Sequence, residues 1–368
     1  MLLKIKQFLR REAILCLALF LACVSSIFHT PQASYIDFDV LCVLLSLMLV
    51  VAGLKSVRFL DYVAVELLNR CKSRLQLVLA LVGITYISSM FVTNDVALLT
   101  FVPLALVIGK TLQMDMERVI ILQTLAANLG SMLTPPGNPQ NLFIYAHYAY
   151  TASSFFGVMA LPCLLSLAYL GLLIFRGVDA PLALTLPALP KPERNTTLVL
   201  LTLLALDIAA VLHLLPKLLA LGITLAVVVL LNYRLLFAVD CSLLVTFVGF
   251  FIFIGNISHT SIVAYLQGSL LGTATGTYFA ALVSSQFISN VPAAMLLAGL
   301  TQEADALLLG VNIGGLGTMI ASMASVISYK LFAKERPQQA GRYVKMFLYY
   351  NFAGLALLGG AVWLVMIR

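Results

Sequence analysis

The chain has 368 residues, of which 62% are hydrophobic and only 10% are charged. A soluble globular domain has about 25% charged residues, so this composition excludes an ordinary soluble protein. The formal net charge of +7 would suit a nucleic-acid partner, but the cytoplasmic loops of membrane proteins also carry an excess of Lys and Arg. We therefore expect an all-α polytopic membrane protein that lies in a lipid bilayer and has no nucleic-acid partner.

Apolar runs near or above 18 residues recur along the chain, and each is long enough to cross a bilayer core of about 30 Å. The first run, Ile14–Phe28, is interpreted as a span and not as a signal peptide, because no small-residue cleavage site leads into a soluble protein. Two later runs end in polar, helix-interrupting tips, and we predict re-entrant hairpins there, at about 73–110 and about 272–301. About nine spans remain, at 13–30, 38–54, 117–147, 152–175, 196–213, 215–233, 240–256, 303–329 and 343–367.

The positive-inside rule favours this arrangement of spans and hairpins. With a cytoplasmic N-terminus, 20 of the 22 Lys and Arg residues fall on the cytoplasmic side, including Lys4, Lys6, Arg10 and Arg11 before the first span. Only Lys217 and Arg368 fall outside. If the hairpins crossed as full spans, the charges of the later loops would be mixed. We therefore predict a multi-pass protein of the inner, cytoplasmic membrane, with its C-terminus outside.

The sequence also contains an internal repeat. Residues 87–94 (Ile-Ser-Ser-Met-Phe-Val-Thr-Asn) align with residues 283–290 (Val-Ser-Ser-Gln-Phe-Ile-Ser-Asn), with four of eight identical and three more conservative. Residues 128–134 align in the same order with residues 312–318. Ordered blocks indicate duplication, and the predicted topology makes the second copy inverted. We predict a first inverted repeat at 1–176, a cytoplasmic linker at 177–195, an inserted span at 196–213 and a second inverted repeat at 214–368.

Two of the predicted spans are interrupted by residues that break helices. Pro135, Pro136 and Pro139 with Gly137 divide the span at 117–147, and a glycine-rich segment at 314–318 divides the span at 303–329. Non-helical backbone at membrane depth is tolerated where it lines a cavity or is buried in protein. An inverted repeat with broken helices that meet near the midplane is typical of alternating-access transporters.

The hairpin tips and the breaks supply the candidate binding residues. The starts of half-helices can hold an anion, and their carbonyls, with Asn, Ser and Thr oxygens, can hold sodium. For a single Ser or Thr, a packing hydrogen bond is the simpler interpretation, but Asn at both tips and both breaks favours a site. The polar residues of these segments are Thr93, Asn94, Asn128, Thr134, Asn138, Gln140, Asn141, Ser289, Asn290, Asn312, Thr318, Ser322 and Ser325.

Asp95 is the most informative residue, because a carboxylate at membrane depth is rare and indicates function by default. It would bind a cation, carry a proton, or cap the returning half-helix. Its repeat partner is Val291. Asp207 lies in the inserted span, outside the repeat core, and we interpret it as a packing residue or as a residue at the membrane interface. No Lys or Arg falls in the predicted core, so an anionic substrate would depend on half-helix N-termini, amides and bound cations.

These segments resemble signatures of the ion transporter superfamily, which includes divalent-anion/sodium symporters, citrate transporters, arsenite permeases and a sodium/proton antiporter family. They are Thr93-Asn94-Asp95, Thr134 to Asn141, Ser289-Asn290 and Asn312. The resemblance implies one sodium site at Thr93, Asn94, Gly137 and Asn138, and a second at Ser289, Asn290, Gly314 and Thr318. It also implies that substrate lies between the tips and that the protein is a homodimer. The Asn94-Asp95 pair is closer to the arsenite-permease and antiporter branches.

We therefore expect a secondary active permease that moves a small inorganic or carboxylate anion, coupled to sodium or protons, by an elevator type of alternating access. A sodium/proton antiporter that uses Asp95 is the alternative. Sodium ions are the only cofactor expected. A membrane-embedded enzyme is disfavoured because the four His residues are dispersed and no His-Glu-x-x-His spacing occurs.

Overall fold

A computed structural model describes residues 12–368 except 178, 183 and 259. The described chain is almost entirely helical, as predicted, and it has no β-strand beyond an isolated bridge between Ser73 and Pro181. Seven helical segments within it are long and apolar enough to cross a membrane. The basic residues before the first span lie outside the described residues.

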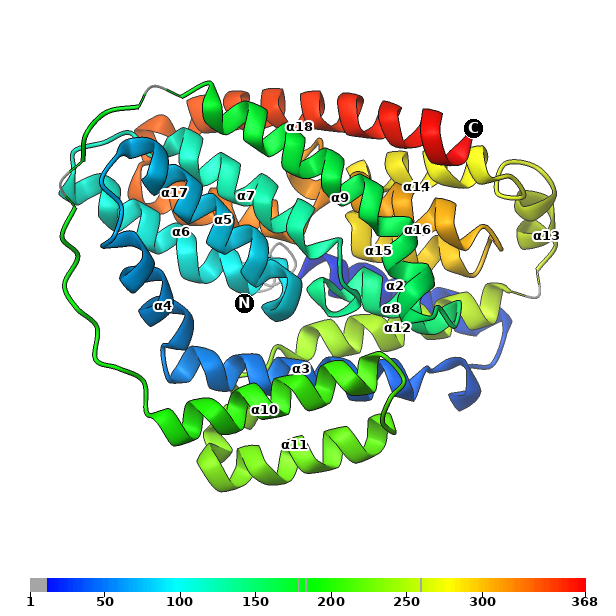
Figure 1. Cartoon of the computed structure of the whole chain (residues 1–368). Coiled ribbons are helices and arrows are strands. Elements are labelled where there is room, and N and C mark those ends of the chain that lie inside the picture. Colours follow the sequence, from blue (N-terminus) through cyan, green and yellow to red (C-terminus); the bar gives the residue numbers. More distant parts are fainter. Residues whose placement is uncertain (1–11, 178, 183, 259) are drawn as a thin grey trace, which may run out of the picture.

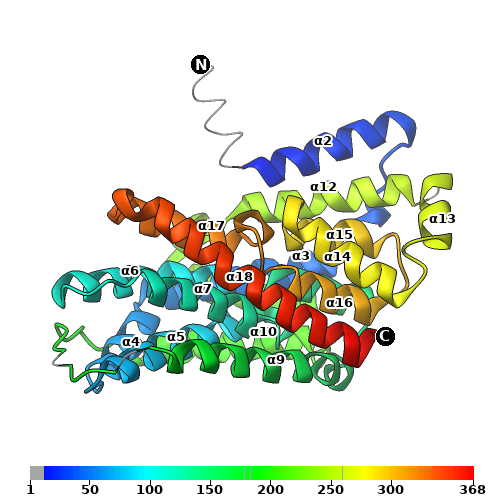
Figure 2. The same cartoon turned by 90° about the horizontal axis from the view of Figure 1, so that it is seen from above.

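One group of helices forms the lower and rear part of the molecule in Figure 1. We call this group the scaffold helices: α2 (Ala13–Phe28), α3 (Phe38–Ser56), α10 (Arg194–Val211), α11 (Lys217–Asn232) and α12 (Cys241–Ile257). In it, α2 packs along α12, and α3 packs against α10 and α11. Figure 2 shows α2 and α12 side by side at one edge.

A second group surrounds the two hairpins. We call these the core helices: α5 (Arg74–Val92), α6 (Asn94–Thr111), α7 (Glu117–Ser131), α8 (Pro139–His147), α14 (Ala274–Ile288), α15 (Asn290–Ala298), α16 (Ala304–Ile313) and α17 (Met323–Glu335). Two long helices, α9 (Ala152–Phe175) and α18 (Ala340–Val362), pack on this core. The short helices α4 (Phe59–Leu68) and α13 (Ser261–Gly268) precede the hairpins.

The two hairpins enter the core from opposite ends. In Figure 1, α5, α6 and α7 lie toward the left, while α14, α15 and α16 lie toward the right. Each hairpin packs against the first half of a broken helix, since α5 lies along α7 and α14 lies along α16. The opposed arrangement is the one that the inverted repeat predicts. The domain boundaries at 176, 195 and 213 stay a prediction.

By length alone, α5 and α6 could each cross a bilayer. Their tip nevertheless stops inside the helical core, because the hydroxyl of Thr134, in the break between α7 and α8, donates to the backbone carbonyl of Met90. Beyond that break, α8 carries the chain nine residues further. The first hairpin therefore ends inside the helical core, while its re-entrant course in the membrane stays a prediction, and each of the nine predicted spans corresponds to one helix or to two half-helices. The last half-helix, α17, is longer than predicted and extends to Glu335.

Candidate functional site

The two hairpin tips have the same backbone geometry. Thr93 adopts φ 71° and ψ 153°, and Ser289 adopts φ 75° and ψ 152°. A positive φ in this region costs a residue with a side chain on the order of 1–3 kcal/mol. In both hairpins the returning helix begins at the next residue, Asn94 or Asn290, and both Asn side chains are buried. The duplicated sequence therefore produces a duplicated strained turn.

The two breaks also correspond. Each contains a short 3-10 turn, η2 (Pro135–Gly137) in the first and η4 (Met319–Ala321) in the second, at aligned positions. The hydroxyl of Thr134 donates to the carbonyl of Met90, and the hydroxyl of Thr318 donates to the carbonyl of Gln286 over 2.8 Å. Because these four residues are aligned in pairs, each hairpin is attached to its own break by the same hydrogen bond.

A second set of hydrogen bonds joins the repeats to each other. Asn128, near the end of α7, accepts from the Ser322 hydroxyl over 2.9 Å, and its amide lies 3.4 Å from the Ser325 hydroxyl. Reciprocally, the Asn312 amide on α16 donates to the Asn141 carbonyl oxygen over 2.7 Å.

The reciprocal pattern is completed by Asn138, whose amide lies 3.5 Å from the Asn312 carbonyl oxygen. In the alignment, Asn138 corresponds to Ser322 and Asn141 to Ser325. Each first half-helix therefore contacts the start of the second half-helix of the opposite repeat. The breaks therefore form one polar centre, in which the hydrogen bonds cross between the two repeats.

The tips connect to this centre through their Asn side chains. The Asn94 amide lies 3.3 Å from the Asn128 carbonyl oxygen, and the Asn94 carbonyl oxygen accepts from the backbone N–H of Asp95 over 2.9 Å. At the second tip, the Asn290 amide packs so closely on Gly315 that an added Cβ would lie 2.9 Å from it. The Asn side chains of both tips therefore lie against the broken helices, Asn94 beside Asn128 and Asn290 beside Gly315.

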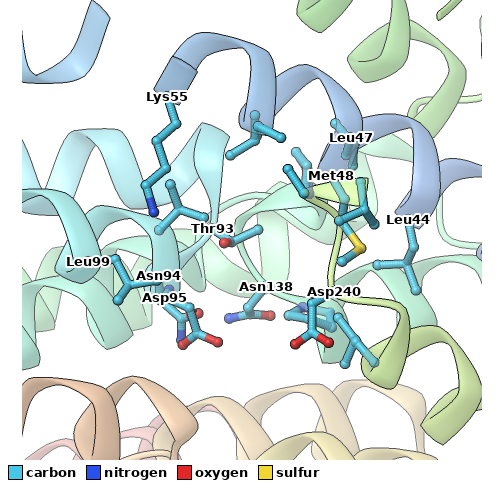
Figure 3. Close-up of a pocket in the computed structure, with 18 of the residues that line it drawn as sticks. Leu44, Leu47, Met48, Lys55, Thr93, Asn94, Asp95, Leu99, Asn138 and Asp240 are labelled. Atoms are coloured by element: carbon cyan, nitrogen blue, oxygen red, sulfur yellow. Dashed lines mark hydrogen bonds between the residues drawn. The ribbon is translucent and has the colours of Figure 1, made fainter. Parts of the chain in front are cut away.

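A cavity of about 580 Å³ reaches the first tip. Its walls come from α3, the first hairpin, the first break, the segment before α12, and α17. Of the predicted site residues, Thr93, Asn94, Asp95 and Asn138 line it, and Figure 3 shows them with the α3 side chains on the opposite wall. Most other lining residues are apolar, such as Leu44, Leu47 and Met48 of α3.

Three charged residues line this cavity among those that the structure describes. Asp95 lies in the first turn of α6, and one of its carboxylate oxygens is buried without a hydrogen-bond partner in the described residues. Asp240 caps α12 by accepting from the backbone N–H of Ser242 over 3.0 Å. Lys55 is the third, from the last turn of α3. Lys55 is exposed and belongs to α3 of the scaffold, so it lines the cavity from outside the core helices.

The remaining predicted site residues lie around the polar centre, away from the cavity walls. Gly137 lies in a confined turn, where an added Cβ would be 2.1 Å from the backbone oxygen of Ser131. Gly314 is confined between the Gly310 carbonyl and the Ser285 hydroxyl. The other predicted residues that do not line the cavity are Asn128, Thr134, Asn141, Ser289, Asn290, Asn312 and Thr318. The first predicted sodium set thus borders the cavity, whereas the second set does not.

Sequence reasoning missed the role of Gln286. Its amide donates to the carbonyls of Gly314 and Leu316 over 2.9 and 3.0 Å, and its side-chain oxygen accepts from the backbone N–H of Thr318 over 2.9 Å. Gln286 is the polar partner of Met90 in the repeat alignment. A polar residue aligned with an apolar one was the sequence signal that could have identified this role. The second break has no prolines, and the Gln286 side chain holds it instead.

Asp207 lies outside this centre. It is buried between three scaffold helices, where it accepts from the hydroxyls of Ser46 over 2.6 Å and Thr224 over 3.1 Å. This position agrees with the packing interpretation of Asp207.

Comparison with known proteins gives a consistent result. The model of the family described as citrate transporter matches residues 1–329. An uncharacterized transporter from Methanocaldococcus jannaschii is 31% identical over 303 residues, which cover 80% of this chain and 81% of that protein. The inner membrane protein YbiR of Escherichia coli is 29% identical over 310 residues, 80% of each chain. The human P protein is 27% identical over 140 residues, 35% of this chain and 17% of that protein.

Proposed function

The chain belongs to the citrate transporter family, and from this membership we propose that it is a secondary active transporter for a small carboxylate or inorganic anion, coupled to sodium or protons. That it is a membrane transporter follows from its family and its relatives. The anion, the coupling ion and the mechanism are the proposal.

The observation that carries the proposal is the cavity that ends on the first tip. It places Thr93, Asn94 and Asn138 on the surface of a cavity that is large enough for a small organic anion. Asn94 and Asn138 connect to the Asn128 and Asn312 centre by hydrogen bonds. A ligand bound there would therefore contact the point at which both repeats meet.

Cation coupling is supported by the oxygen atoms of the tips and breaks. Unwound backbone and the ends of half-helices are the usual sodium ligands in transporters with broken helices. We propose a first cation site at Thr93, Asn94, Gly137 and Asn138, beside the cavity, and a second at Ser289, Asn290, Gly314 and Thr318. Bound cations would offset the two carboxylates of the cavity and so permit an anion to bind.

We propose an elevator type of motion, in which the core helices slide along the scaffold helices. Supporting this, the cavity lies between the two groups, and its scaffold wall is largely apolar. An apolar surface has few directional contacts to break during sliding. A cysteine cross-link between α3 and α8, which pack against each other, should stop transport and leave anion binding intact.

The test is uptake by the purified full-length protein in liposomes. Radiolabelled citrate, succinate, sulfate and phosphate are offered with an inward sodium gradient, an inward proton gradient, or no gradient. We expect at least one anion to accumulate above its equilibrium level, and only with a gradient. If none of the four accumulates under either gradient, the proposal is wrong.

The unpartnered carboxylate oxygen of Asp95 favours one second candidate, a sodium/proton antiporter. An acid that lines a cavity can exchange a proton for a sodium ion at the same position. Liposomes loaded with a pH-sensitive dye would report proton movement when sodium is added. In this candidate Asp95→Asn abolishes the exchange and the matched variant Val291→Asn keeps it, so exchange that persists in Asp95→Asn would exclude the role.

We also propose the cellular setting, which is the inner, cytoplasmic membrane with the N-terminus inside and the C-terminus outside, as a homodimer. Alkaline phosphatase fused after Arg368 should be active, since the enzyme folds only outside the cytoplasm, and an inactive fusion that is stably made would reverse this orientation. The mass of the purified protein in detergent should correspond to two chains.

A further inference from the structure

Lys55 is the only Lys or Arg among the described residues that line the cavity. It lies in the last turn of α3, and Figure 3 shows its side chain extending from the scaffold wall toward the first tip. The positive-inside count treats Lys55 as an ordinary loop charge. Because Lys55 lines the cavity, it can also contact a bound ligand.

Lys55 has no counter-ion in the part of the chain that the structure describes. The ion pairs there are formed by Arg58, Lys110, Lys217 and Arg342. No hydrogen bond of the Lys55 side chain is present among the described residues either. A Lys at a membrane boundary can extend its ammonium group to the headgroups, but this one borders a cavity in which an anion can serve as its partner.

The charged residues that line the cavity come from both of its walls. Lys55 belongs to α3 of the scaffold, and Asp95 belongs to the hairpin of the core. Asp240, at the start of α12 in the scaffold, adds a second carboxylate, so Lys55 is the one positive group beside two negative groups among the described lining residues. The Lys55 side chain is exposed, but the apolar walls of the cavity focus the field of the charges that line it, which strengthens their attraction for a ligand.

We propose that Lys55 is the residue that selects for negatively charged substrate, by pairing with a carboxylate or oxyanion group in the cavity while the cation sites near Asp95 take the coupling ion. This inference rests on the proposed function and makes it specific. It assigns the anion to the scaffold wall and the cation to the hairpin tip. Binding from this side then requires both walls, because Lys55 lies on the scaffold wall and the proposed cation site lies at the hairpin tip.

The test compares Lys55→Gln and Lys55→Arg with Lys72→Gln, a control at an exposed lysine outside the cavity. The probe is whichever of citrate, succinate, sulfate and phosphate the wild type accumulates. Loss of a hydrogen bond to a charged group should raise the KM of Lys55→Gln about tenfold or more. The maximal rate should stay within about twofold, because an ion pair made in the bound state mainly affects affinity. Lys55→Arg, which keeps the charge, should stay within about threefold of wild-type KM.

The outcomes separate this inference from the proposed function. If the wild type accumulates none of the four anions, the proposed function is wrong and this inference falls with it. If the wild type transports but Lys55→Gln has an unchanged KM, only this inference is wrong. A fall in maximal rate at constant KM, or an equal effect in Lys72→Gln, would also overturn it, since either result indicates a role in topology or folding.

Discussion

The two hairpin tips are alike in backbone and different in chemistry. Thr93 and Ser289 adopt the same strained turn, and both hairpins are attached to their breaks by the same threonine hydrogen bond. The difference lies one residue after the tip Asn, where the first repeat has Asp95 and the second has Val291. Only the first tip lines the cavity. The duplication therefore preserved the geometry of the site and let its charge diverge.

The largest effect should come from Gly137→Ala, which tests whether the two breaks tolerate the same side chains. The aligned residue in the second break is a buried alanine, Ala321, but a Cβ at Gly137 would lie 2.1 Å from the Ser131 carbonyl oxygen. We expect a loss of about 3 kcal/mol in stability, measured as a lower melting temperature in detergent. Gly171→Ala is the control, since nothing lies within 4 Å of its added Cβ. Equal melting temperatures for the two variants would contradict the prediction.

The next largest effect should come from the asparagines that join the repeats. Asn128→Leu leaves the Asn94 amide and the hydroxyls of Ser322 and Ser325 without their partner. Asn312→Leu similarly affects Asn138 and Asn141. Each change should cost about 2 kcal/mol, the usual penalty of unsatisfied buried polar groups. Thermal denaturation of the two variants in detergent compares their losses of stability. Losses that differ by much more than about 1 kcal/mol would show that the two halves of the centre are not energetically equivalent.

The charge of Asp95 should make the first tip more important for transport than the second tip, which has Val291 at this position. Asp95→Asn keeps the size of the side chain and removes the charge, so gradient-driven accumulation should fall about tenfold or more, the effect of losing one charged contact. Val291→Asn, at the aligned position of the second tip, should stay within about twofold of wild type, since no charge is lost there. Uptake rates in liposomes, normalised to the amount of protein, provide the measurement. Similar rates for Asp95→Asn and wild type would indicate that transport does not depend on the carboxylate.

The smallest effect should come from the hydrogen bonds that attach each hairpin to its break. Thr134→Val and Thr318→Val keep the shape of the side chain and remove one donor each. Each should cost about 1 kcal/mol. Thr318→Val should be the milder change, because Gln286 still holds that break through three other hydrogen bonds. The order of the two melting temperatures checks this, and the reverse order would argue against a supporting role for Gln286.

Much of this fold could be predicted because its signals are local. The tips at Thr93 and Ser289 interrupt apolar runs, and Pro135 to Pro139 cannot continue a helix. Lys55 could not be placed in the same way, because its significance depends on α3 lying opposite a hairpin that is distant in sequence. The reciprocal pairing of Asn128 and Asn312 was also hidden, since an alignment identifies equivalent residues but not their partners.

The crossed hydrogen bonds of the polar centre have a consequence for the history of the chain. Asn128 is completed by residues of the second repeat, and Asn312 by residues of the first. Neither half contains a whole site, so one half expressed alone would present buried asparagines with no partner. Two such halves could work as separate chains only by assembling with each other. Joining the two halves in one chain makes this mutual completion intramolecular, so that it needs no assembly of separate chains.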